Sequence, residues 1–548
     1  MRVRIRFRWW LLGSALSVFS CTPPPTEPPP LVLPERPHVV WLVAEDLSPV
    51  LPMYGDSTVA TPTLSRLARE GVVFTNVFSV SGVCAPSRYA LATGRYPTSD
   101  GAHHMRTTSG VGGLPAYEAI PPPAVHMLPA LLRQAGYYTA NNSKTDYQFA
   151  PPATAWDASS RTAHWRDRGP GQPFFAMFNL FVTHESQIWR KAEDSLWVDP
   201  DQPVQVPPYR PGTEVVQQDV RRMYSNIREM DAQAGVLLAE LEAAGLLDST
   251  IVVFMSDHGG PLPRQKRAAY DSGLHVPMIV RFPGAQRAGT RDDQLISFVD
   301  LPPTLPPTLL SLAGLTPPAW MQGQAVLGPA RAAERTYVYA AGDRFDGHYD
   351  RVRAVRSGRF KYLRHFFPER PYYKPVVYRE QMATMQELLR LGAAGQLDRA
   401  QAQWFRTEKP AEELFDTHAD PHELRNLAPD PAYADTLARM RTALDQWMAT
   451  TEDRGGLTEA QLIEALWGGA TQPVTAPPTA TGTTSVMLRS STEGASIGYQ
   501  VVADRQALGP RWAVYTRPVM LPAGHRLAAV AHRIGYVPSD TLVVPGRP

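Results

Sequence analysis

A repeated pattern constrains the fold most: short apolar runs alternate with amphipathic segments from about residue 37 to residue 328. Apolar runs bounded by turn residues are typical of strands that are buried on both faces, and helical segments between them favour parallel pairing. "TPTLSRLAREG" carries Pro62 at a first helical position and Gly71 as a stop, and residues 214–245 form a longer amphipathic segment. The pattern predicts an α/β domain with a large mixed, mostly parallel sheet between two layers of helices.

Four of the apolar runs end at charged residues or histidine. "HVVWLVA" precedes Glu45 and Asp46, "YYTANNS" precedes Lys144, "FFAMFNLFVT" precedes His184, and "TIVVFMS" precedes Asp257 and His258. Each could be an ordinary loop residue at the surface. In open α/β sheets, however, ligands bind beyond the carboxyl ends of the strands, so we expect these side chains to converge on one crevice.

The stretch "VCAPSRYALATG" follows another apolar run. The chain has only two cysteines, which argues against a disulfide framework and favours a chemical role for Cys84. Pro86 predicts a helix that ends at Gly94, so that Cys84 lies at a helix N-terminus, where free N–H groups favour an anion. Arg88 follows one turn later. This combination indicates a site for a tetrahedral oxyanion ester, and a thiol nucleophile of phosphatase type is the alternative.

The N-terminus predicts export. Residues 1–20 combine arginines, a short apolar run and small residues, which is typical of a signal peptide. "VFSC" resembles a bacterial lipobox, so Cys21 is a candidate for lipidation, with plain cleavage near Ser20 as the alternative. We expect a protein of the periplasm or cell surface that contacts a membrane only through a lipid anchor, spaced by the Pro-rich residues 21–34. A net charge of +2 argues against a nucleic-acid partner.

Changes in sequence pattern divide the chain into further segments. After an α/β domain over residues 35–335, residues 336–467 contain a hairpin pattern around Ser357-Gly358 and a helical pattern over 431–451, which predict a smaller α+β subdomain. Residues 468–484 are rich in Pro and Thr and are expected to be a linker. Residues 485–548 show short alternating runs separated by turn residues, which predict a β-sandwich.

The stretch from Cys84 to Gly94 resembles the signature of type I sulfatases, C-x-P-S-R-x-x-x-L-x-T-G. The resemblance covers most of residues 37–453 and includes "VVWLVAEDLSP", "VVFMSDHGG" and "ELFDTHADPHELRNLA". It implies an alkaline phosphatase-like fold, and heparan N-sulfatases are the most similar branch. The C-terminal tail resembles the small immunoglobulin-like, chitobiase C-terminal-like domain of some glycoside hydrolases.

The resemblance also implies a cofactor chemistry. In this family a maturation enzyme oxidises the signature cysteine, here Cys84, to formylglycine. One divalent cation, calcium first of all, would be bound by residue 84 together with Glu45, Asp46, Asp257 and His258. The family usually has Asp at position 45 and Asn at position 258, so the coordination geometry can differ here. The imidazole of His258 leaves other divalent cations open.

Roles for further residues come from the same resemblance. Arg88, Lys144 and Lys266 would offset the charge of the sulfate, with Arg267 as the competitor of Lys266, and His184 would protonate the leaving group. Asp146 replaces a histidine of the family pattern. The candidate substrate-binding residues are His104, Asp146, Arg344, Asp346, His348 and Arg351.

The function predicted is hydrolysis of O- or N-linked sulfate on a sulfated oligo- or polysaccharide. One alternative is a phosphomonoester or phosphonate hydrolase of the same superfamily. The other is a surface protein that binds glycans without catalysis.

Overall fold

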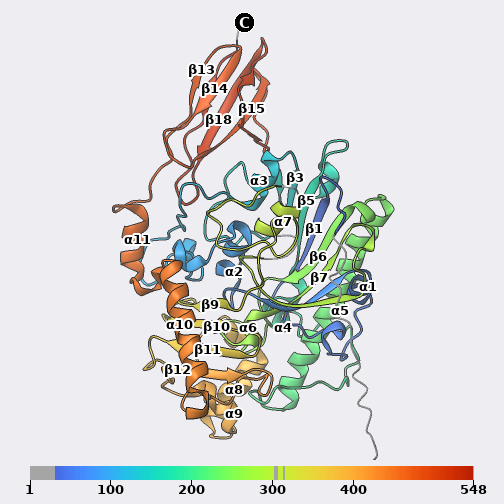
Figure 1. The fold of residues 1–548 in the computed structure, drawn as a ribbon, viewed down its shortest axis with the longest axis vertical. Coiled ribbons are helices and arrows are strands. Elements are labelled where there is room, and N and C mark those ends of the chain that lie inside the picture. Colours follow the sequence, from blue (N-terminus) through green and yellow to red (C-terminus); the bar gives the residue numbers. More distant parts are fainter. Residues whose placement is uncertain (1–30, 301–305, 313–314, 547–548) are drawn as a thin grey trace, which may run out of the picture. The chain divides into compact units, whose positions relative to one another are not determined.

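The structure is a computed structural model that describes residues 31–300, 306–312 and 315–546. Among these residues, an eight-stranded sheet has the strand order β4-β3-β5-β1-β6-β7-β2-β8 (Figure 1). Its strands are β1 (His38–Ala44), β2 (Val72–Phe78), β3 (Tyr138–Asn142), β4 (Ala158–Ser159), β5 (Phe174–Leu180), β6 (Thr250–Ser256), β7 (His275–Arg281) and β8 (Thr290–Ser297). All neighbours are parallel except the pairs made by β7. The sheet is therefore mixed and mostly parallel, which confirms the predicted fold class.

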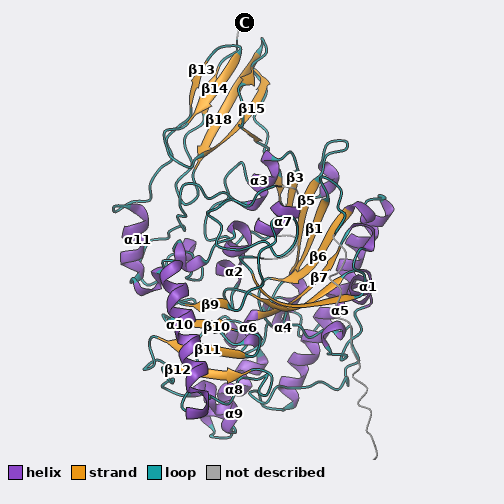
Figure 2. Cartoon of the chain, in the orientation of Figure 1, coloured by secondary structure: helices purple, strands orange, loops and turns teal. Residues whose placement is uncertain are grey.

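Helices cover both faces of this sheet (Figures 1 and 2). On one face, α1 (Pro62–Glu70) and α5 (Glu214–Ala243) pack on alternate strand residues such as Val40 and Phe254. On the other face, residues of α2 (Cys84–Thr93) and α3 (Leu128–Gln134) lie beside Trp41 of β1. Burial on both faces explains why β1, β5 and β6 are apolar along most of their length. The short helices α4 (Ser186–Arg190), α6 (Asp271–Leu274) and α7 (Pro306–Leu312) lie in the connections.

The second subdomain is built on an antiparallel sheet with the order β12-β11-β10-β9. Its strands are β9 (Val338–Gly342), β10 (Val352–Arg356), β11 (Phe360–His365) and β12 (Glu412–Asp416). Strands β10 and β11 form the predicted hairpin. Its helices are α8 (Ala383–Ala393), α9 (Arg399–Ala402), α10 (Ala434–Thr450) and α11 (Glu459–Trp467), and Trp447 of α10 stacks on Tyr339 of β9.

Helix α8 lies in the second subdomain by sequence, yet it packs into the core of the first. Met385 and Leu388 are buried in the same apolar cluster as Val220 of α5. The N–H of Thr384 donates to the carboxylate of Asp219 at 2.6 Å, which joins positions 165 residues apart. The boundary expected near residue 335 therefore does not separate two independent cores.

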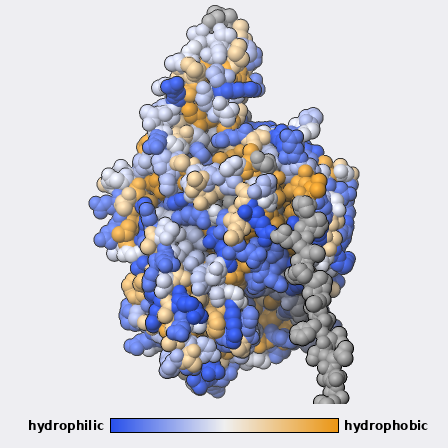
Figure 3. All heavy atoms as spheres, in the orientation of Figure 1, coloured by the Kyte–Doolittle hydropathy of each residue, from blue (hydrophilic) through white to orange (hydrophobic). Residues whose placement is uncertain are grey.

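The C-terminal module consists of two antiparallel sheets that share a core. Strands β13 (Thr479–Thr481), β14 (Ser485–Arg489) and β17 (Val519–Met520) form one sheet. Strands β15 (Ser496–Ala503), β16 (Ala513–Val514), β18 (His525–His532) and β19 (Leu542–Val544) form the other. Val486 of one sheet and Leu527 of the other belong to one buried cluster. Strand β13 lies within the residues expected to be a linker. Figure 3 shows hydrophobic residues scattered among hydrophilic ones on this module.

The predicted signal peptide, Cys21 and most of the Pro-rich spacer lie outside the described residues. Within the described part of the chain, no helix has both the length and the apolar character that a membrane span requires.

Candidate active site

Two adjacent parallel strands bring four predicted metal ligands together. Ala44 at the end of β1 pairs with Ser256 at the end of β6, so the residues that follow leave the sheet at one level. The backbone N–H of Asp46 donates to Asp257 Oδ1 at 3.2 Å, and His258 Nε2 lies 3.1 Å from Asp46 Oδ1. These residues and Glu45 are fully buried. The strand ends thus form a buried, mainly acidic cluster.

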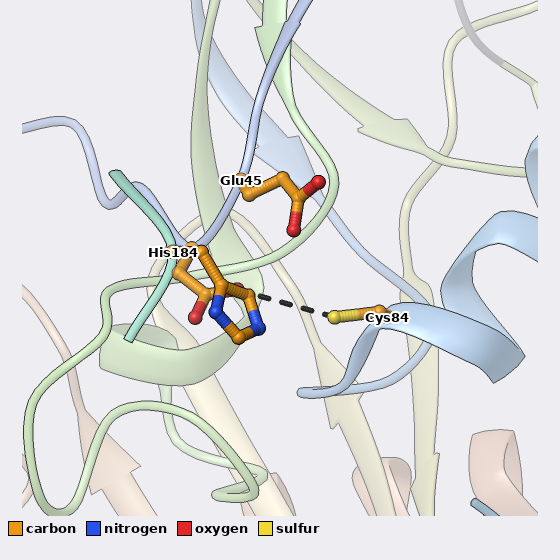
Figure 4. A group of neighbouring side chains, drawn as sticks. Glu45, Cys84 and His184 are labelled. Atoms are coloured by element: carbon orange, nitrogen blue, oxygen red, sulfur yellow. Dashed lines mark hydrogen bonds between the residues drawn. The ribbon is translucent and has the colours of Figure 1, made fainter. Parts of the chain in front are cut away.

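Cys84 is the first residue of α2 and faces this cluster. Its Sγ lies 3.3 Å from His258 Nε2 and 4.0 Å from Asp46 Oδ1. Figure 4 shows Cys84 with Glu45 and His184, which come from different elements of the fold. The helix has no side-chain cap, so the N–H groups of its first turn favour negative charge near Cys84.

The donor set of this cluster fits a divalent cation. Two overlapping groups have ligand atoms within 4.8 Å of one another: Glu45, Asp46, Cys84 and His184, and Cys84, Asp257 and His258. Buried carboxylates are unfavourable unless positive charge compensates them. Glu45 Oε1 is buried and has no hydrogen-bond partner, so one oxygen is free to bind an ion. Oxygen donors suit a hard cation such as calcium, whereas the imidazole and thiol admit other ions.

Protonation follows from the charges of the cluster. Burial opposes the charged form of His258, but Asp257 and Asp46 outweigh it and raise the pKa of His258 to about 10. Burial raises the pKa of Glu45, although Lys144 and Arg88 act against it. The protein without an ion therefore keeps positive charge on the imidazole beside its carboxylates.

Arg88 and Lys144 reach the cluster, as the sequence predicts. Arg88 Nε donates to Asp257 Oδ2 at 3.0 Å, and its Nη1 donates to Asn179 Oδ1 at 2.8 Å. Lys144 Nζ donates to Glu45 Oε2 at 2.7 Å. Arg88 Nη2 is buried and has no hydrogen-bond partner, so one face of the guanidinium is free to bind an anion.

Lys266 and His184 form a hydrogen-bonded pair beside Asp46. Lys266 Nζ donates to Asp46 Oδ2 at 2.7 Å and to His184 Nε2 at 3.1 Å. His184 Nδ1 lies 2.9 Å from Ser186 Oγ, so with Nε2 accepting from Lys266 the ring proton is on Nδ1 and is donated to this hydroxyl. Burial and the charge of Lys266 lower the pKa of His184 to about 3, so the imidazole is neutral and the exchangeable proton resides on Lys266. The sequence predicts that His184 protonates the leaving group, and the structure places Lys266 within hydrogen-bond distance of its imidazole.

Glu185 and Asn179 belong to the site but were missed from the sequence. Glu185 accepts two hydrogen bonds of 2.8 Å from Arg267, and its N–H donates to Asp46 Oδ2 at 2.7 Å. Arg267 thus binds Glu185, while its competitor Lys266 binds Asp46. Glu185 follows His184 directly, which is the only signal that could have found it. Asn179 is a polar residue in an otherwise apolar strand, which was a usable signal.

A pocket opens onto Cys84. Its wall includes Lys144, His184, Lys266, Arg267 and Cys84, and also Met105, Arg106 and three carboxylates, Asp146, Glu185 and Asp346. Asp146 and Asp346 were among the candidate substrate residues, and the structure places both on this wall. Asp346 Oδ2 lies 3.6 Å from Arg267 Nε.

The other four substrate candidates do not line this pocket in the described structure, and His104 and Arg344 are buried. Each of the four has a polar contact with another group of the protein. Arg344 forms a bidentate pair with Glu459 at 2.8 Å, and His104 Nδ1 accepts from the N–H of Arg344. His348 contacts the carbonyl of Pro375, and Arg351 lies 3.5 Å from Asp453. In this structure, the four side chains therefore lie away from the wall of the pocket at Cys84.

Comparison with known proteins gives two family matches. The family model described as Sulfatase matches residues 37–315, and the model described as N-sulphoglucosamine sulphohydrolase, C-terminal, matches residues 264–388. The two matches together span the parallel sheet and the start of the second subdomain.

Individual relatives agree with these matches. An ulvan-active sulfatase of Formosa agariphila is 49% identical over 552 residues, which cover 94% of this chain and 92% of that protein. The human N-sulphoglucosamine sulphohydrolase is 27% identical and covers 76% of this chain and 90% of its own. The solved structure of a 2-O GAG sulfatase superposes with a TM-score of 0.56 at 21% identity, and the match covers 77% of this chain and 94% of that one.

Proposed function

Since this chain belongs to the sulfatase family, we propose that it releases sulfate from a sulfated polysaccharide of the ulvan type. The observation that carries the proposal is the buried cluster around Cys84, in which cations and a free guanidinium nitrogen surround the first residue of a helix. The substrate class is supported by 49% identity to an ulvan-active sulfatase over nearly the whole of both chains. Identity to the human N-sulphoglucosamine sulphohydrolase is lower, which ranks an O-linked sulfate ahead of an N-linked one.

The cofactors are part of the proposal. Cys84 would be oxidised to formylglycine by a maturation enzyme, and the hydrated aldehyde supplies an oxygen nucleophile and a second hydroxyl. Glu45, Asp46, Asp257 and His258 would hold a divalent cation, with calcium as the first candidate. When bound, that cation would supply positive charge that stabilises the negative charge of the sulfate ester and of its transition state.

The chain's own residues perform the remaining work. Arg88 Nη2 and Lys144 bind sulfate oxygens and offset the charge that develops on them. Lys266 holds a proton 3.1 Å from His184 Nε2, so the pair can deliver a proton to the leaving oxygen. Glu185 positions Arg267 and, through its N–H, Asp46.

The experiment is sulfate release from ulvan oligosaccharides by the purified full chain, together with the mass of the peptide that contains Cys84. We expect release by protein that carries the aldehyde and none by Cys84→Ala. A phosphate monoester assayed in parallel tests the phosphatase alternative. Faster phosphate than sulfate release, or glycan binding without any release by matured protein, would overturn the proposal.

We also propose export with lipidation at Cys21, and the N-terminal sequence pattern supports it. The test is fractionation of the native host, in which Cys21→Ala should move the protein from the membrane to the soluble envelope fraction. An unchanged distribution would contradict lipidation.

A further inference from the structure

A second cavity adjoins the active-site pocket. Lys266 and Arg267 line both, so the two spaces share a wall. The rest of the second wall comes from residues 264–270 of the first domain and from residues 342–409 of the second subdomain. Its volume is about 60 Å³, which is room for more than one water molecule or for a small anionic group. The reaction proposed above makes no use of this space.

Basic side chains outnumber acidic ones among the described residues on this wall. The basic ones are Arg264, Lys266, Arg267, Lys374, Arg379 and Lys409, whereas Asp350 is the single carboxylate. Asp350 is shared by Lys409 at 2.7 Å and Lys374 at 3.0 Å. Two cations on one carboxylate leave positive charge uncompensated, and such charge is unfavourable in a partly buried space.

Arg379 has a buried side-chain nitrogen that forms no hydrogen bond. Its side chain is 4% exposed, and its guanidinium lies 4.8 Å from the ring centre of Trp404 and 5.4 Å from that of Tyr373. These rings hold the guanidinium in place. One nitrogen donates to the carbonyl of Lys374, but Nε is buried and has no hydrogen-bond partner. Burial, with the charge of Arg267, lowers the pKa of Arg379 to about 10, although Glu185 and Glu380 act against this shift.

We propose that this cavity binds a second acidic group of the same glycan, a carboxylate or a second sulfate, on the sugar next to the one that loses its sulfate. Arg379 Nε and Lys374 Nζ donate to the oxygens of that group. A fixed guanidinium with a free N–H is suited to planar or tetrahedral oxyanions. Lys266 and Arg267 line both spaces, so a chain whose reactive sulfate lies at Cys84 can reach the second cavity with a neighbouring sugar. The inference rests on the proposed function and narrows its substrate to polyanionic chains.

The test compares Arg379→Met with the parent enzyme on three disaccharides. Each carries the same reactive sulfate, and its neighbour is a uronic acid, a second sulfated sugar or a neutral sugar. We expect kcat/KM to fall by about 10- to 100-fold for one or both acidic neighbours, mainly through KM, and by less than about 3-fold for the neutral one. The substrate that is affected identifies carboxylate or sulfate as the ligand.

Arg390→Met is the matched control, because Arg390 lies on α8, is 60% exposed and pairs with Glu387 away from the cavity. It should leave all three substrates unchanged. Arg379→Lys keeps the charge and loses the Nε donor, and it should show an intermediate loss that is again confined to the acidic neighbours. That variant decides the question if Arg379→Met does not fold.

Equal losses on all three substrates, or no loss on any, would overturn the cavity proposal while wild-type sulfate release stands. A wild-type enzyme that releases no sulfate from any substrate would instead overturn the proposed function.

Discussion

Two buried charge networks of this protein look alike in composition and differ in completeness. In the second subdomain, fully buried Arg353 donates from every nitrogen: Nη1 to Asp343 at 3.0 Å, and Nε and Nη2 to Asp453 at 2.6 and 2.8 Å. In the first domain, Arg88 is equally buried, yet its Nη2 and Glu45 Oε1 form no hydrogen bond and lie 4.0 Å from each other.

This difference in hydrogen bonding distinguishes an arginine that supports the fold from one that can bind a ligand. Pairing every nitrogen of Arg353 avoids the cost of about 1–3 kcal/mol that each unpaired buried polar atom carries. A network that leaves a donor and an acceptor free bears that cost, and a ligand can recover it. Arg379 in the second cavity belongs to the same class as Arg88.

Breaking the complete network should have the largest effect on stability. Arg353→Met leaves Asp343 and Asp453 without their cation, so we expect the free energy of unfolding to fall by about 3–5 kcal/mol. Urea unfolding measures it. Activity per folded molecule should stay within about 2-fold, since Arg353 does not line the pocket at Cys84. A small stability loss would show that the completeness of the network is unimportant.

Breaking the incomplete network should act on catalysis. Arg88→Met removes the free guanidinium nitrogen, and we expect kcat to fall by about 10²- to 10³-fold, or about 3–4 kcal/mol in the barrier. Initial rates of sulfate release measure it, with unfolding followed in parallel. The comparison fails if this variant loses as much stability as Arg353→Met and keeps its rate.

Metal removal tests the carboxylates of the same cluster, including Glu45, whose Oε1 forms no hydrogen bond. Stripping the protein with a chelator should abolish sulfate release and lower the free energy of unfolding by about 3–4 kcal/mol, if the ion is present at 100 to 1,000 times its Kd. Thermal unfolding with and without added calcium measures it. The Arg353→Met variant should lose the same additional amount, because the two networks are independent. An unchanged melting temperature would argue against an ion at Glu45.

A pair with one half-exposed partner should have the smallest effect on the free energy of unfolding, and it is the reference for the buried networks. Arg511 of the C-terminal module lies 2.7 Å from Asp157 of the first domain, and its side chain is 51% exposed. Arg511→Ala should lower the free energy of unfolding by at most about 1 kcal/mol, because Arg511 is half exposed and Asp157 keeps Arg133 at 2.9 Å. Urea unfolding checks this value. A loss near that of Arg353→Met would mean that burial does not govern these pairs.

The position of the site could be predicted from the sequence because strand ends of a parallel sheet meet at one edge. Glu45, Lys144 and Asp257 each follow a run that was predicted to be a strand. The local sequence pattern was therefore sufficient to place them at the edge of the sheet. Cys84 at the start of α2 followed from Pro86. The antiparallel direction of β7 did not follow, since an apolar run carries no information about strand direction.

Pairs between distant segments could not be predicted. Glu185 meets Arg267 across 82 residues, and Arg344 meets Glu459 across 115. Nothing in the local sequence of Arg344 distinguishes a residue that binds a buried glutamate from one that binds a sugar. Only the structure could therefore separate Asp146 and Asp346, which lie on the pocket wall, from the other four substrate candidates, which do not.

The docking of α8 on α5 has a consequence for synthesis. Val220 is translated long before Leu388, yet both complete one core, so this core stays open until residue 388 has left the ribosome. Apolar surface of α5 is exposed throughout that interval, which makes the nascent chain a target for chaperones and for aggregation. The C-terminal module differs, since its buried residues lie between 486 and 531 and are translated within a short interval.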